Sequence, residues 1–491
     1  MKTHKIIIFF IILIGISNSS YAQNKNTYDR NKAMEKFAKQ RDKEFDDWRD
    51  AANAEFTNYL KESWAAFNVS MGVKDPIGPV PDKPEYYQGI KPLEVMTSHG
   101  LPASFNTVSP TIKPCGGISS YVSIEKEVCH INFFGIKKDI PYAKNMYLSN
   151  VENSENDVAK AWETLSKSNY RPTLESIHSI DKQCDLSDWA RYQLIKSLTE
   201  AIYSKDKINE RIVSQMFLLC QFKYKVKVGT ADSYLVLLLP FVENIYHVPY
   251  IDIDGKNLSI FSYNKISSIT SLYTYKKDFS ASNQIVSLCN NKPMKLGNSD
   301  NYEIVDLPLW SKILGRDVKI PINKSFIQFT LNYPQSDLTT YHHSVVDGQT
   351  KKYILRQVKY QILKNKYSKK EAVAFILKLI QNGFEYKTDY EMFGRSKPLF
   401  IEESIYYKAN NCKDRVLIFS WLVKETVGLN TVMLLYPGHV SCGIEFDETV
   451  DGDYIMNNDK KYIICDPTFI NAPIGSTMTK FIGEIPEIKE I

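Results

Sequence analysis

The sequence predicts an α+β protein of several domains. Its 491 residues are too many for one compact core, so we expect two to four domains. Two periodicities alternate along the chain: apolar residues at three- and four-residue steps, typical of helices, and at every second position, typical of strands. Four prolines between Pro76 and Pro84 forbid both helix and central strand there, and they predict a domain boundary.

Residues 1–22 have the pattern of a secretory signal peptide. Lys2 and Lys5 precede an apolar run from Ile6 to Ile16, and Ser20-Tyr21-Ala22 forms a small-residue cleavage site. We therefore expect an exported protein, periplasmic or secreted, with no membrane insertion after signal removal. Losing the two lysines leaves 59 basic against 56 acidic residues, a net charge of +3 in place of +5. This near balance gives no reason to expect nucleic acid as a partner.

Residues 23–74 are expected to form a long amphipathic helical segment. Apolar side chains recur at three- and four-residue steps from Met34 to Phe67, and charged residues occupy the other face. The pattern favours a helix or hairpin docked along the body of the protein. A self-associating coiled coil is the alternative, but large aromatic residues such as Trp48 and Trp64 fit a heptad seam poorly.

Residues 85–260 are predicted to form a mixed α/β domain. A buried-type helix at 210–219 is followed by strands near 224–228 and 234–239. A hairpin with an Asp-Gly turn at 254–255 comes next.

Residues 261–345 are predicted to form a β-rich accessory region. The segments 318–322 and 326–331 alternate apolar and polar residues and are expected to be strands. Adjacent His342 and His343 could suggest a metal-ligand pair. Neighbouring residues on a strand point to opposite faces, which favours solvated loop histidines instead.

The cysteines show no metal-binding pattern. There is no CxxC motif and no Cys/His spacing suited to zinc, so we expect no metal and no cofactor. Export permits disulfides, but if Cys412 is a free nucleophile, at least one other cysteine is unpaired. The eight cysteines are Cys115, Cys129, Cys184, Cys220, Cys289, Cys412, Cys442 and Cys465.

The most informative stretch lies in residues 346–491. Asn410 and Asn411 precede Cys412, and the apolar run that follows, without Gly or Pro, predicts a helix buried all round. Asparagine at the N-cap would place Cys412 in the first helical turn. There the partial positive charge of the helix end favours a thiolate, which is a strong nucleophile.

Two residues downstream can assist this thiol. His439 follows Pro437-Gly438 and opens a predicted strand, and Asp466 ends another. A nucleophile needs a base, and the base needs a group that orients it. Strand alternation places Cys442 on the face opposite His439, and Cys465 opposite Asp466. Both cysteines are then core residues, or a cross-strand pair if directly opposed.

At these residues the sequence resembles the transglutaminase-like superfamily of papain-type cysteine enzymes. The matching motifs are Asn411–Asp414, Pro437–His439 and Asp466–Thr468, and the resemblance covers about residues 350–475. It implies a papain-like domain over 346–491 with a triad of Cys412, His439 and Asp466. The backbone N–H of Cys412 would be one oxyanion donor. Tyr386 and Gln381 are candidates for a second.

The resemblance implies cysteine-dependent acyl transfer or amide hydrolysis through a thioester acyl-enzyme, with a protein or peptide as substrate. The sequence does not choose between water and an amine as acceptor, and the oligomeric state is open. The alternative is a binding or scaffold protein that keeps a vestigial triad.

The region 85–260 repeats the order of elements expected around Cys412. Setting Phe217–Leu219 against Trp421–Val423 places Ile208 where Cys412 lies. It also sets Glu210-Arg211 opposite Asp414-Arg415. This predicts a second, degenerate transglutaminase-like unit without a nucleophile. The alternative is two unrelated α/β segments, and a different strand order would rule out the duplication.

Overall fold

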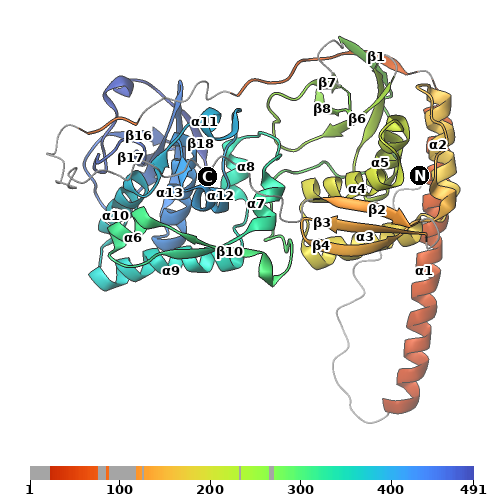
Figure 1. The fold of residues 1–491 in the computed structure, drawn as a ribbon, viewed down its shortest axis with the longest axis horizontal. Helices are drawn as coiled ribbons and strands as arrows, with labels where there is room; N and C mark the ends of the chain where they lie inside the picture. Colours follow the sequence, from red (N-terminus) through yellow and green to blue (C-terminus); the bar gives the residue numbers. More distant parts are fainter. Residues whose placement is uncertain are drawn as a thin grey trace. The chain divides into compact units, whose positions relative to one another are not determined.

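The computed structural model describes residues 23–62, 64–75, 84–87, 118–123, 127–231, 234–264 and 270–491 (Figure 1). The chain divides into two compact units, Met1–Glu55 and Phe56–Ile491. The predicted signal peptide, most of the proline-rich stretch and Cys115 lie outside the described residues. Within the described ranges, no helix combines the length and apolar character needed to cross a membrane.

The N-terminal helix α1 runs from Gln23 to Leu60, as predicted for most of this segment. The helix prediction is wrong beyond it, because β1 (Ala65–Asn68) is a strand that pairs antiparallel with β9 (Ser271–Thr274). Near the end of α1, the Phe56 ring packs edge-on against Trp162 at 4.8 Å. The apolar stripe of this helix is predicted from the sequence to pack on the body of the protein. This is wrong for four of its side chains, which are exposed: Met34, Phe37, Phe45 and Trp48.

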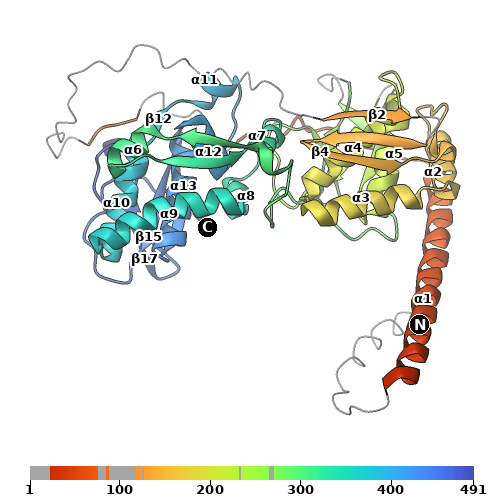
Figure 2. The same ribbon diagram turned by 60° about the horizontal axis from the view of Figure 1, so that its bottom comes forward.

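The first half of the second unit is α+β. Its helices are α2 (Glu155–Lys167), α3 (Arg171–Cys184), α4 (Asp188–Ile202) and α5 (Ile208–Gln221), with a 3-10 turn η2 (Lys144–Met146). Its remaining strands are β2 (Ser119–Ser123), β3 (Val128–Phe133), β4 (Ile136–Pro141), β5 (Lys227–Ala231), β6 (Tyr234–Pro240), β7 (Tyr250–Ile253) and β8 (Lys256–Phe261). Strands β2, β3 and β4 form a small antiparallel sheet that lies beside α3 and α4 (Figure 2). β1 and β9 join the sheet of β5–β8, so this sheet extends past the expected limits of 85–260.

The region 261–345 is not β-rich but mixed. Besides β9, its elements are η3 (Ser299–Asn301), β10 (Tyr302–Asp306), α6 (Pro308–Leu314), β11 (Lys319–Asn323), α7 (Lys324–Thr330) and α8 (Leu338–His343). The prediction of a strand at 318–322 is confirmed by β11, but that at 326–331 is wrong. The Asn323 side chain caps α7, accepting from the N–H groups of Ser325 at 3.0 Å and Phe326 at 3.4 Å. This local cap favours helix over the alternating pattern.

The two adjacent histidines lie in α8 and not in a loop. His342 is buried, whereas His343 is exposed. The prediction of two solvated histidines is therefore wrong for His342, because α8 turns this side chain into the core.

The C-terminal part contains the sheet expected to carry the triad. Its helices are α9 (Gly348–Asn365), α10 (Lys369–Asn382), α11 (Asp389–Phe393), α12 (Ile401–Tyr407) and α13 (Cys412–Thr426), with a 3-10 turn η4 (Thr479–Phe481). Its strands are β12 (Glu385–Tyr386), β13 (Ala409–Asn410), β14 (Asn430–Tyr436), β15 (His439–Glu445), β16 (Tyr454–Asn457), β17 (Lys460–Cys465) and β18 (Glu487–Glu490). A capping box formed by Ser368 and Glu371 starts α10. Helix α13 is buried between α10 and the strands β14 and β15 (Figure 1).

Two of the sheets have the same strand order. The order is β7-β8-β6-β5-β9, with β1 at the edge, in the first and β16-β17-β15-β14-β18 in the second. All neighbouring strands in both are antiparallel. Each sheet is preceded by a buried helix, α5 or α13, which packs on β6 or β15 respectively. This strand order agrees with the predicted duplication.

Candidate functional site

The thiol of Cys412 lies at the first residue of α13, as the sequence predicts. The preceding Asn411 has extended backbone, and its N–H donates to Oδ2 of Asp414 at 3.2 Å. This bond ties the N-cap to the third helical residue, which is one half of a capping box. Cys412 has no exposed surface. The start of the helix is therefore fixed, and the thiol is held in a dry environment.

His439 and Asp466 meet across the sheet. His439 is the first residue of β15, and Asp466 directly follows the last residue of β17. Nε2 of His439 lies 2.7 Å from Oδ2 of Asp466, and both side chains are buried. Burial alone lowers the pKa of His439, but the Asp466 carboxylate outweighs it. The nearby Cys412 adds a smaller contribution, and the pKa of His439 rises to about 10.

The remaining edge and one face of the imidazole are also defined. Since Nε2 is held by Asp466, Nδ1 is the atom left for the thiol, and among the described residues it has no hydrogen-bond partner. The Phe481 ring lies against the imidazole, with centroids 5.1 Å apart and planes at 10°. The ring orientation of His439 is therefore set by a carboxylate at one edge and an aromatic ring on one face.

A buried ionic network, which the sequence did not indicate, holds the start of α13. Asp389, the first residue of α11, accepts a hydrogen bond from Asn411 Nδ2 at 2.6 Å and forms an ion pair with Lys413. The Lys397 N–H donates to the same carboxylate at 2.8 Å. Burial lowers the pKa of Lys413, but Asp389 and Asp414 outweigh it and raise the pKa above its ordinary value. The residues on both sides of Cys412 are thus anchored to one carboxylate.

A second buried pair strengthens the same region. Nζ of Lys397 lies 2.6 Å from Oε1 of Glu403, and both side chains are almost completely buried. Asp414 accepts from the Leu399 N–H at 2.9 Å. Burial raises the pKa of Asp414 to about 7, against the opposing effect of Lys413. In the sequence, the capping box formed by Thr388 and Glu391 is the local pattern that indicates the start of α11.

The two candidate oxyanion donors differ in their surroundings. Nε2 of Gln381 donates to the carbonyls of Asp466, Phe469 and Ala472 at 3.2, 2.8 and 3.0 Å, so it is already fully used. Gln381 is therefore a structural residue that holds the loop after Asp466. Burial, and then the charge of Cys412, raise the pKa of Tyr386. Tyr386 stays a candidate.

The other two cysteines of this sheet lie as strand parity predicts. Cys442 and Cys465 are directly opposed on β15 and β17, and both are completely buried free thiols. Burial raises the pKa of both thiols above the ordinary value. They form part of the core beneath the site.

Both similar sheets lie within Phe56–Ile491, one in an N-terminal unit with α5 and β5–β9 and one in a C-terminal unit with α13 and β14–β18. The N-terminal unit has no triad at the corresponding positions. Its helix α5 begins at Ile208 as α13 begins at Cys412. In both units two residues join the first two strands, so Tyr234 opens β6 where His439 opens β15.

The counterpart of Asp466 follows from the register. The residue three positions after the start of β6 pairs with Phe261. The residue three positions after the start of β15 pairs with Cys465. Ser262 is thus the counterpart of Asp466. A thiol, an imidazole and a carboxylate are all replaced by groups that cannot perform the same chemistry.

One buried arginine is shared by both units. Arg415 donates to the carbonyls of Gln381 at 3.1 Å and Phe384 at 3.0 Å. Arg211 donates to the carbonyl of Tyr203 at 3.2 and 2.7 Å. Each arginine thus ties the buried helix to the end of an earlier helix, α10 or α4. Because the contact recurs in the unit without a triad, it serves the fold.

The residues between α10 and α13 are specific to the C-terminal unit. Residues 383–411 separate these helices, whereas only 203–207 separate α4 from α5. The longer segment carries α11 and α12, and with them Asp389 and both buried ion pairs around the start of α13. The unit with the triad is therefore also the unit with the added support for its thiol.

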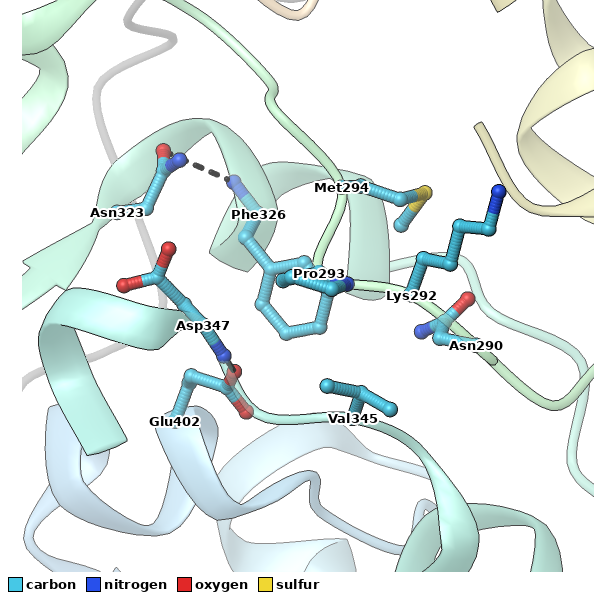
Figure 3. Close-up of a pocket in the computed structure, with 9 residues that line it drawn as sticks. All are labelled: Asn290, Lys292, Pro293, Met294, Asn323, Phe326, Val345, Asp347 and Glu402. Atoms are coloured by element: carbon cyan, nitrogen blue, oxygen red, sulfur yellow. Dashed lines mark hydrogen bonds between the residues drawn. The ribbon is translucent and has the colours of Figure 1, made fainter. Parts of the chain in front are cut away.

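A small hollow elsewhere in the same unit contains no triad residue (Figure 3). Its volume of 10 Å³ holds about one water molecule. Oε1 of Glu402 accepts from the Asp347 N–H at 2.7 Å, and burial raises the pKa of Glu402 to about 7. The hollow is too small for a substrate. Its lining is Asn290, Lys292, Pro293, Met294, Asn323, Phe326, Val345, Asp347 and Glu402.

Among the described residues, no group of three or more His, Cys, Asp or Glu side chains is arranged to hold a metal ion. Comparison with known proteins gives no match to any family model, curated protein or solved structure.

Proposed function

We propose that this protein is a cysteine-dependent acyl-transfer or amide-hydrolysing enzyme of transglutaminase-like type. One observation carries the proposal: a thiol at a helix start lies near an imidazole whose Nε2 is 2.7 Å from a buried carboxylate. This geometry suits a nucleophile, a base and an orienting group. The resemblance at Asn411–Asp414, Pro437–His439 and Asp466–Thr468 supports the same assignment.

The first half of the reaction forms a thioester. Cys412 gives its proton to Nδ1 of His439, and the sulfur attacks the carbonyl carbon of an amide. The C–N bond breaks as the imidazolium returns the proton to the leaving amine. Asp466 keeps the imidazole oriented and stabilises its positive charge. The backbone N–H of Cys412 is available for the developing oxyanion at the helix start.

The second half releases the acyl group. Water or a primary amine attacks the thioester carbon, His439 accepts the proton of the attacking group, and the sulfur leaves and regains a proton. Water gives hydrolysis, and an amine gives transfer. We propose a protein or peptide as substrate and an exported location, on the resemblance and on the signal pattern of residues 1–22.

A second candidate, a scaffold protein with a vestigial triad, is favoured by one observation. Neither Cys412 nor His439 has any exposed surface. A substrate carbonyl must approach the sulfur to about 3–3.5 Å, which this closed arrangement does not allow. If the protein is an enzyme, the site must therefore open before a substrate can reach the sulfur of Cys412.

The experiment incubates the full chain with a peptide library and a labelled primary amine, comparing wild type with Cys412→Ala. Cysteine-dependent release of cleaved or deamidated peptide supports hydrolysis, and incorporation of the label supports transfer. No difference from Cys412→Ala over long incubation would favour the scaffold reading. Iodoacetamide alkylation of Cys412 adds a second readout. A fast rate that is insensitive to pH near neutrality indicates an activated thiolate.

A further inference from the structure

The triad is closed by a segment that also carries one of its members. Phe481 stacks on the His439 imidazole at 5.1 Å, and Tyr436 packs on Phe481 at 4.6 Å. The chain between Asp466 and Phe481 therefore supplies both the carboxylate and the aromatic cover. Any movement that lifts Phe481 exposes the imidazole.

A short piece of distant chain, residues 84–87, is fastened to this segment. The Ile470 N–H donates to the carbonyl of Glu85 at 2.8 Å, and the Tyr87 N–H donates to the carbonyl of Ile470 at 2.9 Å. Tyr86 and Ile470 form a parallel β-bridge. Both backbone groups of Ile470, four residues after Asp466, are thus paired with an extended peptide segment.

Side chains on both ends of residues 84–87 add to this pairing. The Tyr87 ring packs edge-on against Phe469, with centroids 5.5 Å apart and planes at 78°. Tyr87 also packs on the apolar cluster that contains Tyr436 and Phe481. Glu85 forms an ion pair of 3.1 Å with Lys480, the neighbour of Phe481. The contacts of residues 84–87 therefore extend to the residues that cover His439.

We propose that residues 84–87 are a built-in inhibitory clasp. They occupy a peptide-docking edge at Phe469–Ile470 and hold Phe481 over His439, and Cys412 becomes accessible only when they leave. The inference rests on the proposed function, since only a working thiol needs such a gate. The edge fits an extended peptide with an acidic and an aromatic side chain two residues apart, as in Glu85 and Tyr87.

The test measures the rate at which iodoacetamide alkylates Cys412 in the full chain, with Cys412→Ala as the baseline. Tyr87→Ala removes an edge-on aromatic contact and buried area, and should raise the rate about tenfold. Glu85→Lys reverses a half-exposed ion pair, and should raise it about threefold. Glu85→Lys combined with Lys480→Glu restores the attraction and should return the rate towards wild type. Tyr86→Ala is the matched control, because its side chain is 67% exposed.

Intact mass separates local opening from unfolding. Opening of the clasp adds one label, on Cys412, to those that the folded Cys412→Ala chain takes up at partly exposed thiols such as Cys289, whereas unfolding also labels buried thiols such as Cys220 and Cys442. Equal rates for Tyr87→Ala and Tyr86→Ala would overturn the proposal. If the Tyr87→Ala variant unfolds, the variants of Glu85 and Lys480 provide the test. An alkylation rate in Glu85→Lys equal to that of wild type then contradicts the clasp.

The same data separate the clasp from the proposed function. If the clasp variants raise the alkylation rate of Cys412 but this rate follows the pH profile of an ordinary thiol, the clasp is supported and an activated nucleophile is contradicted. If the alkylation rate of wild type is already fast and insensitive to pH, and no clasp variant changes it, the activated nucleophile is supported and the clasp is contradicted.

Discussion

The side-chain amide of Gln381 donates to the backbone carbonyl of Asp466 at 3.2 Å. Its Nε2 also reaches the carbonyls of Phe469 and Ala472. One buried amide therefore holds three points of the loop that begins with the triad carboxylate. The position of Asp466 depends on α10 as much as on the strand that precedes it.

Replacement of Gln381 by Met should lower stability and activity together. The two N–H groups of this amide are shared among three buried carbonyls, and at about 1 kcal/mol for each hydrogen bond the expected loss is about 2–3 kcal/mol in the free energy of unfolding. Urea denaturation measures this loss. Gln361→Met is the matched control, because Nε2 of Gln361 donates to one carbonyl, that of Leu314, at 2.9 Å. It should cost about 1 kcal/mol and leave the activity intact. Equal losses in the two variants would contradict the role given to Gln381.

The parts of the fold that the sequence predicts well are those with a local cause. Ser368 and Glu371 start α10 through a capping box, and an uninterrupted apolar run after Cys412 forms α13. The two-residue turn before His439 fixes the start of β15. The triad residues could be selected because each lies at the end of such an element.

The parts that the sequence predicts poorly depend on pairing between distant segments. Strand β1 forms because it meets β9, some 200 residues later, and local periodicity carries no trace of that partner. The Asp389–Lys413 pair joins α11 to α13, and neither residue stands out locally. The segment 326–331 fails for a different reason, since a single capping residue, Asn323, outweighs its alternating pattern.

Asp389 and Lys413 should show strong energetic coupling. Asp389→Ala leaves the ammonium of Lys413 buried without its carboxylate, which should cost about 3–5 kcal/mol. The double variant Asp389→Ala/Lys413→Met removes both charges and should be less destabilised than the sum of the single variants. A double-mutant cycle in urea measures the difference. The surface pair Lys369–Asp447 is the control, with coupling below about 1 kcal/mol. Additive effects at Asp389 and Lys413 would refute the network.

Cys442 and Cys465 should not react while the protein is folded. Both are completely buried, and burial raises the pKa of both thiols. Iodoacetamide should therefore modify them only after denaturation, as peptide mapping would show. Cys442→Ala should leave the alkylation rate of Cys412 within about twofold of wild type, because β15 points Cys442 and His439 to opposite faces. Modification of Cys442 in the folded state at the rate of Cys412 would contradict this assignment.

The His439–Asp466 pair should stabilise the fold more at neutral than at alkaline pH. Burial lowers the pKa of His439, but Asp466 outweighs it, and the pKa rises from the ordinary 6.5 to about 10. A pKa raised by folding gives a stabilisation that is complete below about pH 6.5 and is lost as the pH rises through about 10. Asp466→Asn removes this contribution. It should cost about 3 kcal/mol near pH 6.5 and progressively less up to pH 10.

Urea denaturation of wild type and Asp466→Asn at several pH values between about 6 and 10 measures this dependence. Asp139→Asn is the matched control, because Oδ1 of Asp139 lies 2.7 Å from Nδ1 of His130 with the carboxylate 69% exposed. That surface pair should contribute less than about 1 kcal/mol at any pH. A difference between wild type and Asp466→Asn that stays constant, or grows as the pH rises, would show that His439 carries no extra proton in the folded state. The assignment of His439 as the base for Cys412 would then lose one of its supports.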